Sequence, residues 1–171
     1  MITIRAETSK DLDGIRHVVE MAFGQTGEAR LVEALRQAGA LITSLVAVEE
    51  EQIVGHIAFS ALAIESQDTT MNAIALAPLA VLPSHQRRGI GTELVRRGID
   101  HCRRAGYRAV LVLGEPVFYQ RFGFMKASLH GISCPFDVPD EAFMVAELFP
   151  GALAGHRGMV KYRPEFELVS G

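Results

Sequence analysis

Apolar and polar residues follow one another in blocks that predict an order of strands and helices. Residues 1–5 alternate like a short strand, and apolar positions in residues 12–22 recur at the three- and four-residue spacing of a helix. Residues 24–27 contain two glycines that break this helix, and residues 28–37 begin a second helical stripe. The chain is therefore expected to open with one strand and two consecutive helices.

The next block predicts a hairpin followed by a central strand. Residues 44–48 and 53–64 are rich in apolar and β-branched side chains, and the polar segment Glu-Glu-Glu-Gln between them is the available turn. Residues 73–82 are almost continuously apolar, as expected of a strand buried on both faces. We therefore expect this strand at the centre of the sheet.

Residues 88–104 predict an amphipathic helix. Its apolar stripe includes Cys102, which is therefore expected in the core, while arginines occupy the opposite face. A strand at residues 109–113 follows. Because a strand, a helix and a strand in succession return the chain in the same direction, this strand is expected to run parallel to residues 73–82.

The C-terminal part predicts shorter elements. A short helix follows Gly114, and residues 124–129 can form a strand. The proline-punctuated tail contains two further strands, at residues 142–148 and 158–162. The whole chain, residues 1–171, is thus predicted to be a single α+β domain: a mixed, largely antiparallel sheet with helices on both faces, in three α/β/α layers.

Composition narrows the class of protein. The chain has 171 residues, of which 49% are hydrophobic and 22% charged, which suits one soluble domain with a sizeable core. The net charge of -3 gives no general attraction to nucleic acid or to an anionic membrane. No segment resembles a signal peptide or reaches the ~18 apolar residues of a membrane span. We therefore expect a cytoplasmic protein with no nucleic-acid or membrane partner.

Two local features of the composition have structural interpretations. Cys102 and Cys134 lack the spacing of metal ligands, so no metal site is expected. Arginines are concentrated in residues 87–108. An RNA-binding surface would need aromatic residues among these arginines, and residues 93–105 contain none. We interpret the arginines of this helix as a solvated face.

The sequence Gln-Arg-Arg-Gly-Ile-Gly-Thr, residues 86–92, stands where the predicted central strand passes into the amphipathic helix. The first amides of a helix have no intrahelical acceptor, and together with the helix dipole they attract phosphate. Glycines let the backbone approach such a group closely. A Walker loop would need lysine where Gly91 stands, and a dinucleotide fingerprint would need glycine in place of Leu94. The segment therefore predicts a phosphorylated ligand bound by neither of these loops.

The remaining pattern, Q-x-x-G-x-G after an apolar strand and a proline turn, resembles the acetyl-CoA diphosphate loop of the GNAT superfamily of N-acetyltransferases. The order of elements over residues 1–130 is similar to that family, and residues 118–124, FYQRFGF, resemble its Y-x-x-x-G-F signature. Three segments resemble the YhbS-like subgroup of predicted acetyltransferases: PLAV at residues 78–81, GEPVFYQRFGF at residues 114–124 and DEAFMVAEL at residues 140–148.

The resemblance implies a GNAT acyl-CoA N-acyltransferase fold and an enzyme that transfers the acetyl group of acetyl-CoA to a primary amine, of a small molecule or a peptide, by direct attack in a ternary complex. It assigns the pantetheine arm to the backbone of Leu79, Ala80 and Val81, with the Ala80 amide polarising the thioester carbonyl. It assigns the diphosphate to the loop, where we expect the arginine side chains to be free to add charge. The expected diphosphate-binding residues are Gln86, Arg87, Arg88, Gly89, Ile90, Gly91 and Thr92.

Tyr119 occupies the position that the family uses for the acid that protonates the departing thiolate. Its structural alternative is a buried aromatic residue whose hydroxyl bonds to the backbone. No Asp or Glu lies in residues 72–85, where several relatives carry the base. Glu28, near the expected acceptor site, and His56, on the hairpin, are the candidate bases. As structural alternatives, Glu28 is a helix-start carboxylate favoured by the dipole and His56 is a hydrogen-bonded sheet histidine. A chain of water molecules could then carry the proton instead.

Two other functions stay open at this stage. One is a CoA-binding sensor or regulatory module without turnover, and the other is an acyltransferase that uses another acyl-CoA or a hydroxyl acceptor, because a fold does not fix its chemistry. The sequence does not select the acceptor or the oligomeric state, although an exposed tail strand could pair two copies into a homodimer.

Overall fold

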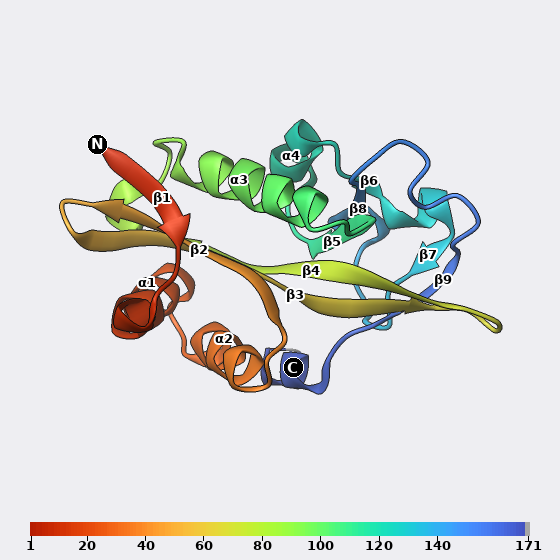
Figure 1. Ribbon diagram of the computed structural model, residues 1–171, viewed down its shortest axis with the longest axis horizontal. Helices are drawn as coiled ribbons and strands as arrows, with labels where there is room; N and C mark the ends of the chain where they lie inside the picture. The colour runs from red at the N-terminus through yellow and green to blue at the C-terminus, as the bar shows by residue number, and fades with distance from the viewer. Residues whose placement is uncertain (170–171) are drawn as a thin grey trace. The chain divides into compact units, whose positions relative to one another are not determined.

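A computed structural model describes residues 1–169, and its elements follow the predicted order (Figure 1). The strands are β1 (Ile2–Ala6), β2 (Leu41–Glu49), β3 (Gln52–Glu65), β4 (Thr70–Val81), β5 (Ala109–Leu113), β6 (Met125–Lys126), β7 (Ile132–Ser133), β8 (Phe143–Glu147) and β9 (Gly158–Lys161). The α-helices are α1 (Leu12–Phe23), α2 (Gly27–Gln37), α3 (Ile90–Arg104) and α4 (Pro116–Tyr119). The 3₁₀ helices are η1 (Ser9–Asp11), η2 (Pro83–His85), η3 (Gln120–Phe122), η4 (Ala127–His130), η5 (Asp140–Ala142) and η6 (Pro164–Leu168).

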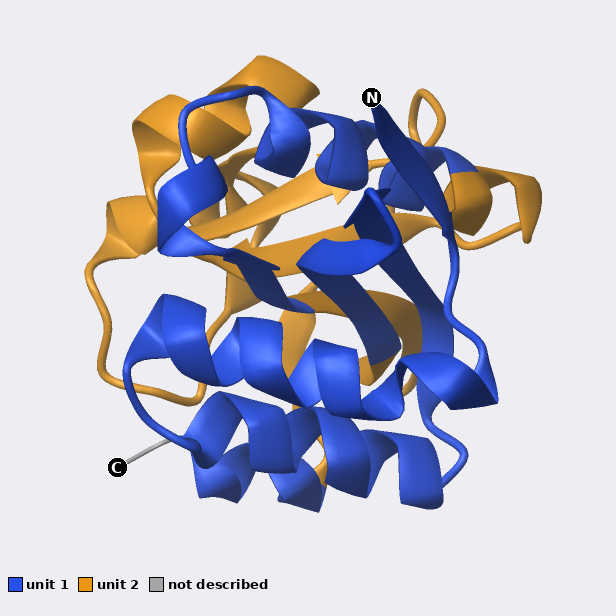
Figure 2. Cartoon of the chain, turned by 90° about the vertical axis from the view of Figure 1, so that its left-hand side faces the viewer, with its two compact units in different colours: residues 1–60, 77–100, 164–171 blue, residues 61–76, 101–163 orange. Residues whose placement is uncertain are grey.

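The described chain forms two compact units (Figure 2). Unit 1 contains residues 1–60, residues 77–100 and the segment from Pro164 onward. Unit 2 contains residues 61–76 and residues 101–163. Strands β3 and β4 contribute residues to both units.

The strands form one mixed sheet. Its order is β1-β2-β3-β4-β5-β8-β6, so β4 is the central strand, as predicted. Strand β5 runs parallel to β4, with Ile74 opposite Val110, and this also confirms the prediction. The pairs β1–β2, β2–β3, β3–β9, β5–β8 and β6–β8 are antiparallel. The predicted fold class, a mixed and largely antiparallel sheet with helices, is therefore confirmed.

Within unit 1, α1 and α2 cover one face of the strands and α3 covers the other (Figures 1 and 2). Gly14 of α1 lies against Ile53 of β3, whereas Gly55 of the same strand lies against Leu94 of α3. The β2–β3 ladder skips Val54, and a bulge of this kind turns the residues on its two sides to opposite faces. The bulge therefore lets one strand support helices on both faces.

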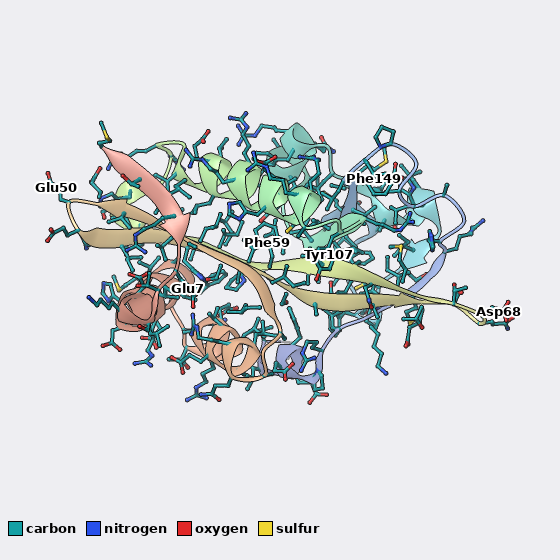
Figure 3. The ribbon with its side chains drawn as sticks, in the orientation of Figure 1. Glu7, Glu50, Phe59, Asp68, Tyr107 and Phe149 are labelled. Atoms are coloured by element: carbon teal, nitrogen blue, oxygen red, sulfur yellow. The ribbon has the colours of Figure 1, made fainter. Side chains whose placement is uncertain are left out.

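Helix α3 approaches β3 closely at Gly98. A Cβ atom at this position would lie 2.1 Å from the ring of Phe59, which Figure 3 shows between β3 and α3. Any larger residue would force the helix or the ring to move. The contact of Gly98 with Phe59 therefore fixes the distance of α3 from the sheet, and with it the position of the first turn of the helix.

Several predicted boundaries change; β2 and β4, for example, each begin three residues earlier than predicted. Helix α3 begins at Ile90, two residues later than predicted, because Gly89 has a φ of 82°, which a right-handed helix does not allow. The strand expected at residues 124–129 shrinks to β6, because the chain turns into η4 from Ala127. No helix within residues 1–169 has the length and low charge needed to cross a bilayer.

The core agrees with the predicted apolar stripes. Cys102 of α3 is completely buried, as expected for a core residue. The tail strands differ from the prediction, because neither offers an exposed edge. Strand β8 pairs with β5 and β6, and β9 pairs with β3 and β7. The expected basis for a homodimer, pairing through an exposed tail strand, is therefore wrong for the described strands.

Candidate active site

The loop that joins β4 to α3 is anchored at its start. The side-chain amide of Gln86 donates a hydrogen bond of 3.1 Å to the carbonyl of Val81, the last residue of β4. The amide of Leu82 donates a bond of 2.9 Å to the carbonyl of Val54 on β3. These two bonds hold the beginning of the loop against the last residue of β4 and against β3.

The backbone of residues 87–91 has the geometry of an anion site. The first hydrogen bond of α3 runs from the amide of Glu93 to the carbonyl of Gly89, at 3.1 Å, so the amides of Ile90 and Gly91 precede the helical ladder. Arg87 and Gly89 both have left-handed backbones, with φ of 65° and 82°. A loop with left-handed residues directly before a helix can hold an anion at the positive end of the helix dipole.

The two arginines of this loop differ in their surroundings. We expected both side chains to be free, but Arg88 Nη2 lies 2.9 Å from Glu49 Oε2. This correction arises because the β2–β3 hairpin places a carboxylate beside the loop. Arg87 is exposed, and its side chain makes no hydrogen bond or ion pair within residues 1–169. Arg87 is therefore the loop cation that remains available to a ligand.

Glu49 is the site residue that the sequence analysis missed. Besides Arg88, it contacts His85, whose Nε2 lies 3.1 Å from Oε1 of the carboxylate. The hydrogen bonds from these two residues lower the pKa of Glu49 below its usual range. Its position in the polar hairpin turn concealed this role, because a turn glutamate is ordinarily solvated.

The residues assigned to the pantetheine arm lie at the end of β4. Ala80 is buried, while Leu79 and Val81 are half-buried. The parallel ladder between β4 and β5 ends at Ala75 and Leu111, before this stretch begins. Together with the loop, these residues belong to unit 1.

Tyr119 is the last residue of α4, in unit 2. Its ring makes edge contacts with Phe118 and Phe124, at centroid distances of 4.9 and 5.6 Å, and lies against Gly114. The hydroxyl makes no hydrogen bond within the described chain. Its oxygen is not wholly buried, because the wholly buried polar atoms without a partner do not include it. Burial of the ring raises the pKa of Tyr119 to about 12. The phenol is therefore protonated at neutral pH and can donate its proton to a group at its surface.

Glu28 lies in the first turn of α2 and is half-buried. The side-chain amide of Gln25 donates to its two carboxylate oxygens, at 3.1 and 3.3 Å. Segment η6 packs on α2, and a Cβ on Gly27 would lie 3.1 Å from the carbonyl of Leu168. The carboxylate of Glu28 thus stands where the helix-joining loop, the start of α2 and the C-terminal segment meet.

His56 has a different environment, because its side chain is completely buried. Its Nε2 lies 2.8 Å from the hydroxyl of Ser44, which bonds to Glu7, and Arg36 holds Glu7 through two bonds of 2.8 Å. The ring nitrogen Nδ1 has no partner in the described chain. Burial lowers the pKa of His56 to about 4. These features fit the hydrogen-bonded sheet histidine and argue against a base that meets the substrate.

The sequence analysis missed the group that surrounds His56. Arg36 lies in α2, Ser44 in β2 and Glu7 just after the end of β1, and Figure 3 labels Glu7 where β1 leads toward the helices. The available signal was a polar Ser44 and a polar His56 inside two apolar strands, since buried polar side chains need partners. No cluster of three His, Cys, Asp or Glu side chains within residues 1–169 has the arrangement of a metal site.

A mixed sheet whose central strand passes through a Gln-x-x-Gly-x-Gly anion loop into an amphipathic helix defines a class of protein, the acyl-CoA acyltransferases of the GNAT fold. Residues 3–127 match the acetyltransferase (GNAT) domain, and the chain belongs to the GNAT family. The predicted family resemblance is therefore confirmed.

Individual relatives extend the similarity to nearly the whole chain. The chain is 37% identical over 164 residues to the uncharacterized N-acetyltransferase YhbS of Escherichia coli strain K12, covering 95% of this chain and 97% of that protein. The fold matches the crystal structure of Escherichia coli YhbS in complex with CoA, with a TM-score of 0.91, 36% identity, and coverage of 97% of this chain and 92% of the other. It also matches a GNAT family acetyltransferase from Brucella melitensis in complex with acetyl-CoA, with a TM-score of 0.78, 35% identity, and coverage of 97% and 98%.

Proposed function

We propose that this chain is an acetyl-CoA-dependent N-acetyltransferase that acetylates a primary amine by direct attack in a ternary complex. The observation that carries the proposal is the backbone of the β4–α3 loop. It is left-handed at Arg87 and Gly89, directly before the amides that precede the Glu93–Gly89 hydrogen bond of α3. The similarity to a CoA complex of YhbS and to an acetyl-CoA complex from Brucella melitensis supports the same ligand.

The loop has the chemistry that a diphosphate requires. In the proposal the amides of residues 88–91 bind its oxygens, and Arg87 adds a positive charge that has no ion-pair partner in the described chain. Arg88 takes part through its amide, because its guanidinium is held by Glu49. Gln86 takes part by fixing the loop on Val81. The dipole of α3 favours the same negative charge.

The residues at the end of β4 bind the pantetheine arm in the proposal. The β4–β5 ladder ends at Ala75, so an extended arm can add to the backbone of Leu79, Ala80 and Val81 as a further strand would. The amide of Ala80 then donates to the thioester oxygen, where negative charge develops as the amine attacks. Acetyl-CoA supplies the activated acyl group: the carbon–sulfur bond breaks as the carbon–nitrogen bond forms.

Tyr119 supplies the proton that the departing sulfur gains. The phenol is protonated through the neutral range, and its hydroxyl has no competing partner in the described chain. The amine loses a proton in the same reaction, and we assign this proton to Glu28 rather than to His56. Glu28 is half-buried, whereas His56 is wholly buried and its Nε2 contacts Ser44.

The test is to measure acetyl-CoA binding by calorimetry and thiol release with a panel of amines. Binding, together with release of free CoA thiol by at least one amine, is the expected result. Absence of binding by the folded chain contradicts the proposal. Binding without thiol release for any amine identifies a CoA-binding module instead, and a parallel series with propionyl- and longer acyl-CoA tests whether another acyl group is preferred.

A further inference from the structure

The diphosphate loop is held from outside by one carboxylate. Glu49, the last residue of β2, places its two oxygens on two different loop residues: Oε1 lies 3.1 Å from His85 Nε2 and Oε2 lies 2.9 Å from Arg88 Nη2. These partners stand 36 and 39 residues further along the chain. We call this arrangement of Glu49, His85 and Arg88 the hairpin clamp.

The clamp brackets the loop. His85 immediately precedes Gln86, and Arg88 immediately precedes Gly89. Between the two clamped residues lies Arg87, whose left-handed backbone, with φ of 65°, is unfavourable for a residue with a Cβ by about 1–2 kcal/mol. A strained residue of this kind persists where the surrounding chain is held, and the clamp holds Arg88, which follows Arg87, and His85, two residues before it.

The ring of His85 is fixed at both nitrogens. A carboxylate accepts hydrogen bonds but cannot donate them, so Nε2 carries the proton that points to Glu49. Nδ1 lies 2.7 Å from the hydroxyl of Ser84, which can donate to it. The neutral imidazole therefore satisfies both contacts, and the clamp does not require His85 to be charged.

The anchor of the clamp is itself rigid. Glu49 is followed by the hairpin turn at Glu50 and Glu51, which have φ of 49° and 67°. Two consecutive left-handed residues form the tight turn whose twist matches that of the flanking strands. The position of Glu49 is thus set by the β2–β3 ladder rather than by the loop.

We propose that Glu49 is a positioning residue for acetyl-CoA, which holds the loop amides in their diphosphate-binding conformation before the ligand arrives. The inference rests on the proposed function of this loop. The proposed effect of Glu49 on CoA affinity has the opposite sign to simple electrostatics, because a negative charge beside a diphosphate site would by itself oppose binding. If Glu49 acted only as a charge, its removal would strengthen binding, whereas loss of the clamp weakens binding.

The experiment compares Glu49→Gln with Glu50→Gln by calorimetry with CoA. Both changes remove one negative charge from the same hairpin, but Glu50 stands at its exposed tip, labelled in Figure 3, and its side chain makes no hydrogen bond or ion pair with the loop within residues 1–169. In Glu49→Gln an amide NH₂ group replaces one carboxylate oxygen. The NH₂ group cannot accept a hydrogen bond, so the side chain can accept from only one of its two partners. Since an exposed ion pair is worth up to roughly fivefold in an equilibrium constant, we expect about fivefold weaker binding for Glu49→Gln. Glu50→Gln is expected to bind as tightly as the unmodified chain or slightly more tightly.

Steady-state kinetics separate positioning from general damage. We expect Glu49→Gln to raise the KM for acetyl-CoA by a similar factor, with kcat at saturating acetyl-CoA and the KM for the amine unchanged. Equal or tighter CoA binding by folded Glu49→Gln overturns the inference. If the unmodified chain does not bind CoA, the proposed function itself fails, and the two failures are therefore distinct.

A second variant covers the case in which Glu49→Gln does not fold. His85→Ala releases one arm of the clamp and leaves Glu49 in its strand. Weaker CoA binding by this variant supports the inference, and unchanged binding overturns it.

Discussion

The proposed diphosphate loop of unit 1 would act through backbone amides, whereas the proposed acid of unit 2, Tyr119, would act through a side chain. In the loop, residues 86–89 are exposed, and the proposed functional groups are the amides of the following turn. At Tyr119 the ring is buried, and the functional group is one side-chain oxygen whose pKa burial raises to about 12. The loop should therefore respond to changes of backbone and charge, and Tyr119 to the loss of a single atom.

The largest effect is expected at Gly89. Gly89→Asp places a side chain on a backbone with φ of 82° and brings a negative charge to the anion site. A like charge about 4 Å away costs about 4 kcal/mol at an effective dielectric constant of 20, so CoA binding should weaken about a thousandfold. Calorimetry measures it. Gly106→Asp is the matched control, because Gly106 has a similar φ of 89° and lies beyond the end of α3. Retained affinity in folded Gly89→Asp would contradict the loop assignment.

The opposite response is expected at Tyr119. Tyr119→Phe keeps the ring contacts and removes the acid, so kcat should fall about a hundredfold, at the low end of what a general acid contributes. The affinity for CoA should not change. Tyr107→Phe, at a half-buried tyrosine outside the site, should leave kcat unaltered. An unchanged kcat in Tyr119→Phe would remove this residue from the mechanism.

His56 extends the comparison to a side chain that is completely buried, to which the proposed mechanism assigns no proton transfer. Its pKa of about 4 in the folded chain lies below the unfolded value of 6.5, so its contribution to stability is complete above pH 6.5 and is lost as the pH falls toward 4. The free energy of unfolding should decrease by about 3 kcal/mol over this window because of His56 alone. Urea unfolding at pH 7.5 and 4.5 measures it. His56→Gln should abolish most of the decrease and exposed His101→Gln should keep it; an equal decrease in both would show that His56 is not responsible.

The smallest effect is expected at Glu28. Because water can also accept the proton of the amine, Glu28→Gln should lower kcat by about tenfold, less than a general base usually contributes. The rate should be compared with that of Glu33→Gln, which removes a carboxylate from the same helix, where it pairs with Arg16. Indistinguishable rates for the two variants would assign the proton to water.

The elements of this fold could be predicted because their apolar patterns are local. The central strand β4 and the stripe of α3 followed from the residue pattern within one element, and the hairpin and the parallel β5 followed from the order of neighbouring elements. The boundaries of an element were harder to predict. Helix α3, for example, starts where the backbone of Gly89 allows it and not where the apolar pattern begins.

The contacts that shape the site could not be predicted, because they join residues far apart in the chain. Nothing in the loop sequence indicated that Glu49 would hold Arg88. The group around His56 joins Glu7, which follows β1, to Arg36 of α2 and Ser44 of β2. The pairing of β9 with β3 was hidden for the same reason. Sequence spacing identified the amides that could bind a phosphate, but not the side chains that set their geometry.

The most direct test of the central claim is a crystal structure of this chain with acetyl-CoA bound. The account predicts diphosphate oxygens within hydrogen-bonding distance of the amides of Gly89, Ile90 and Gly91, with the Arg87 guanidinium beside them and Arg88 still on Glu49. A diphosphate bound elsewhere on the chain, with these amides facing only solvent, would contradict it.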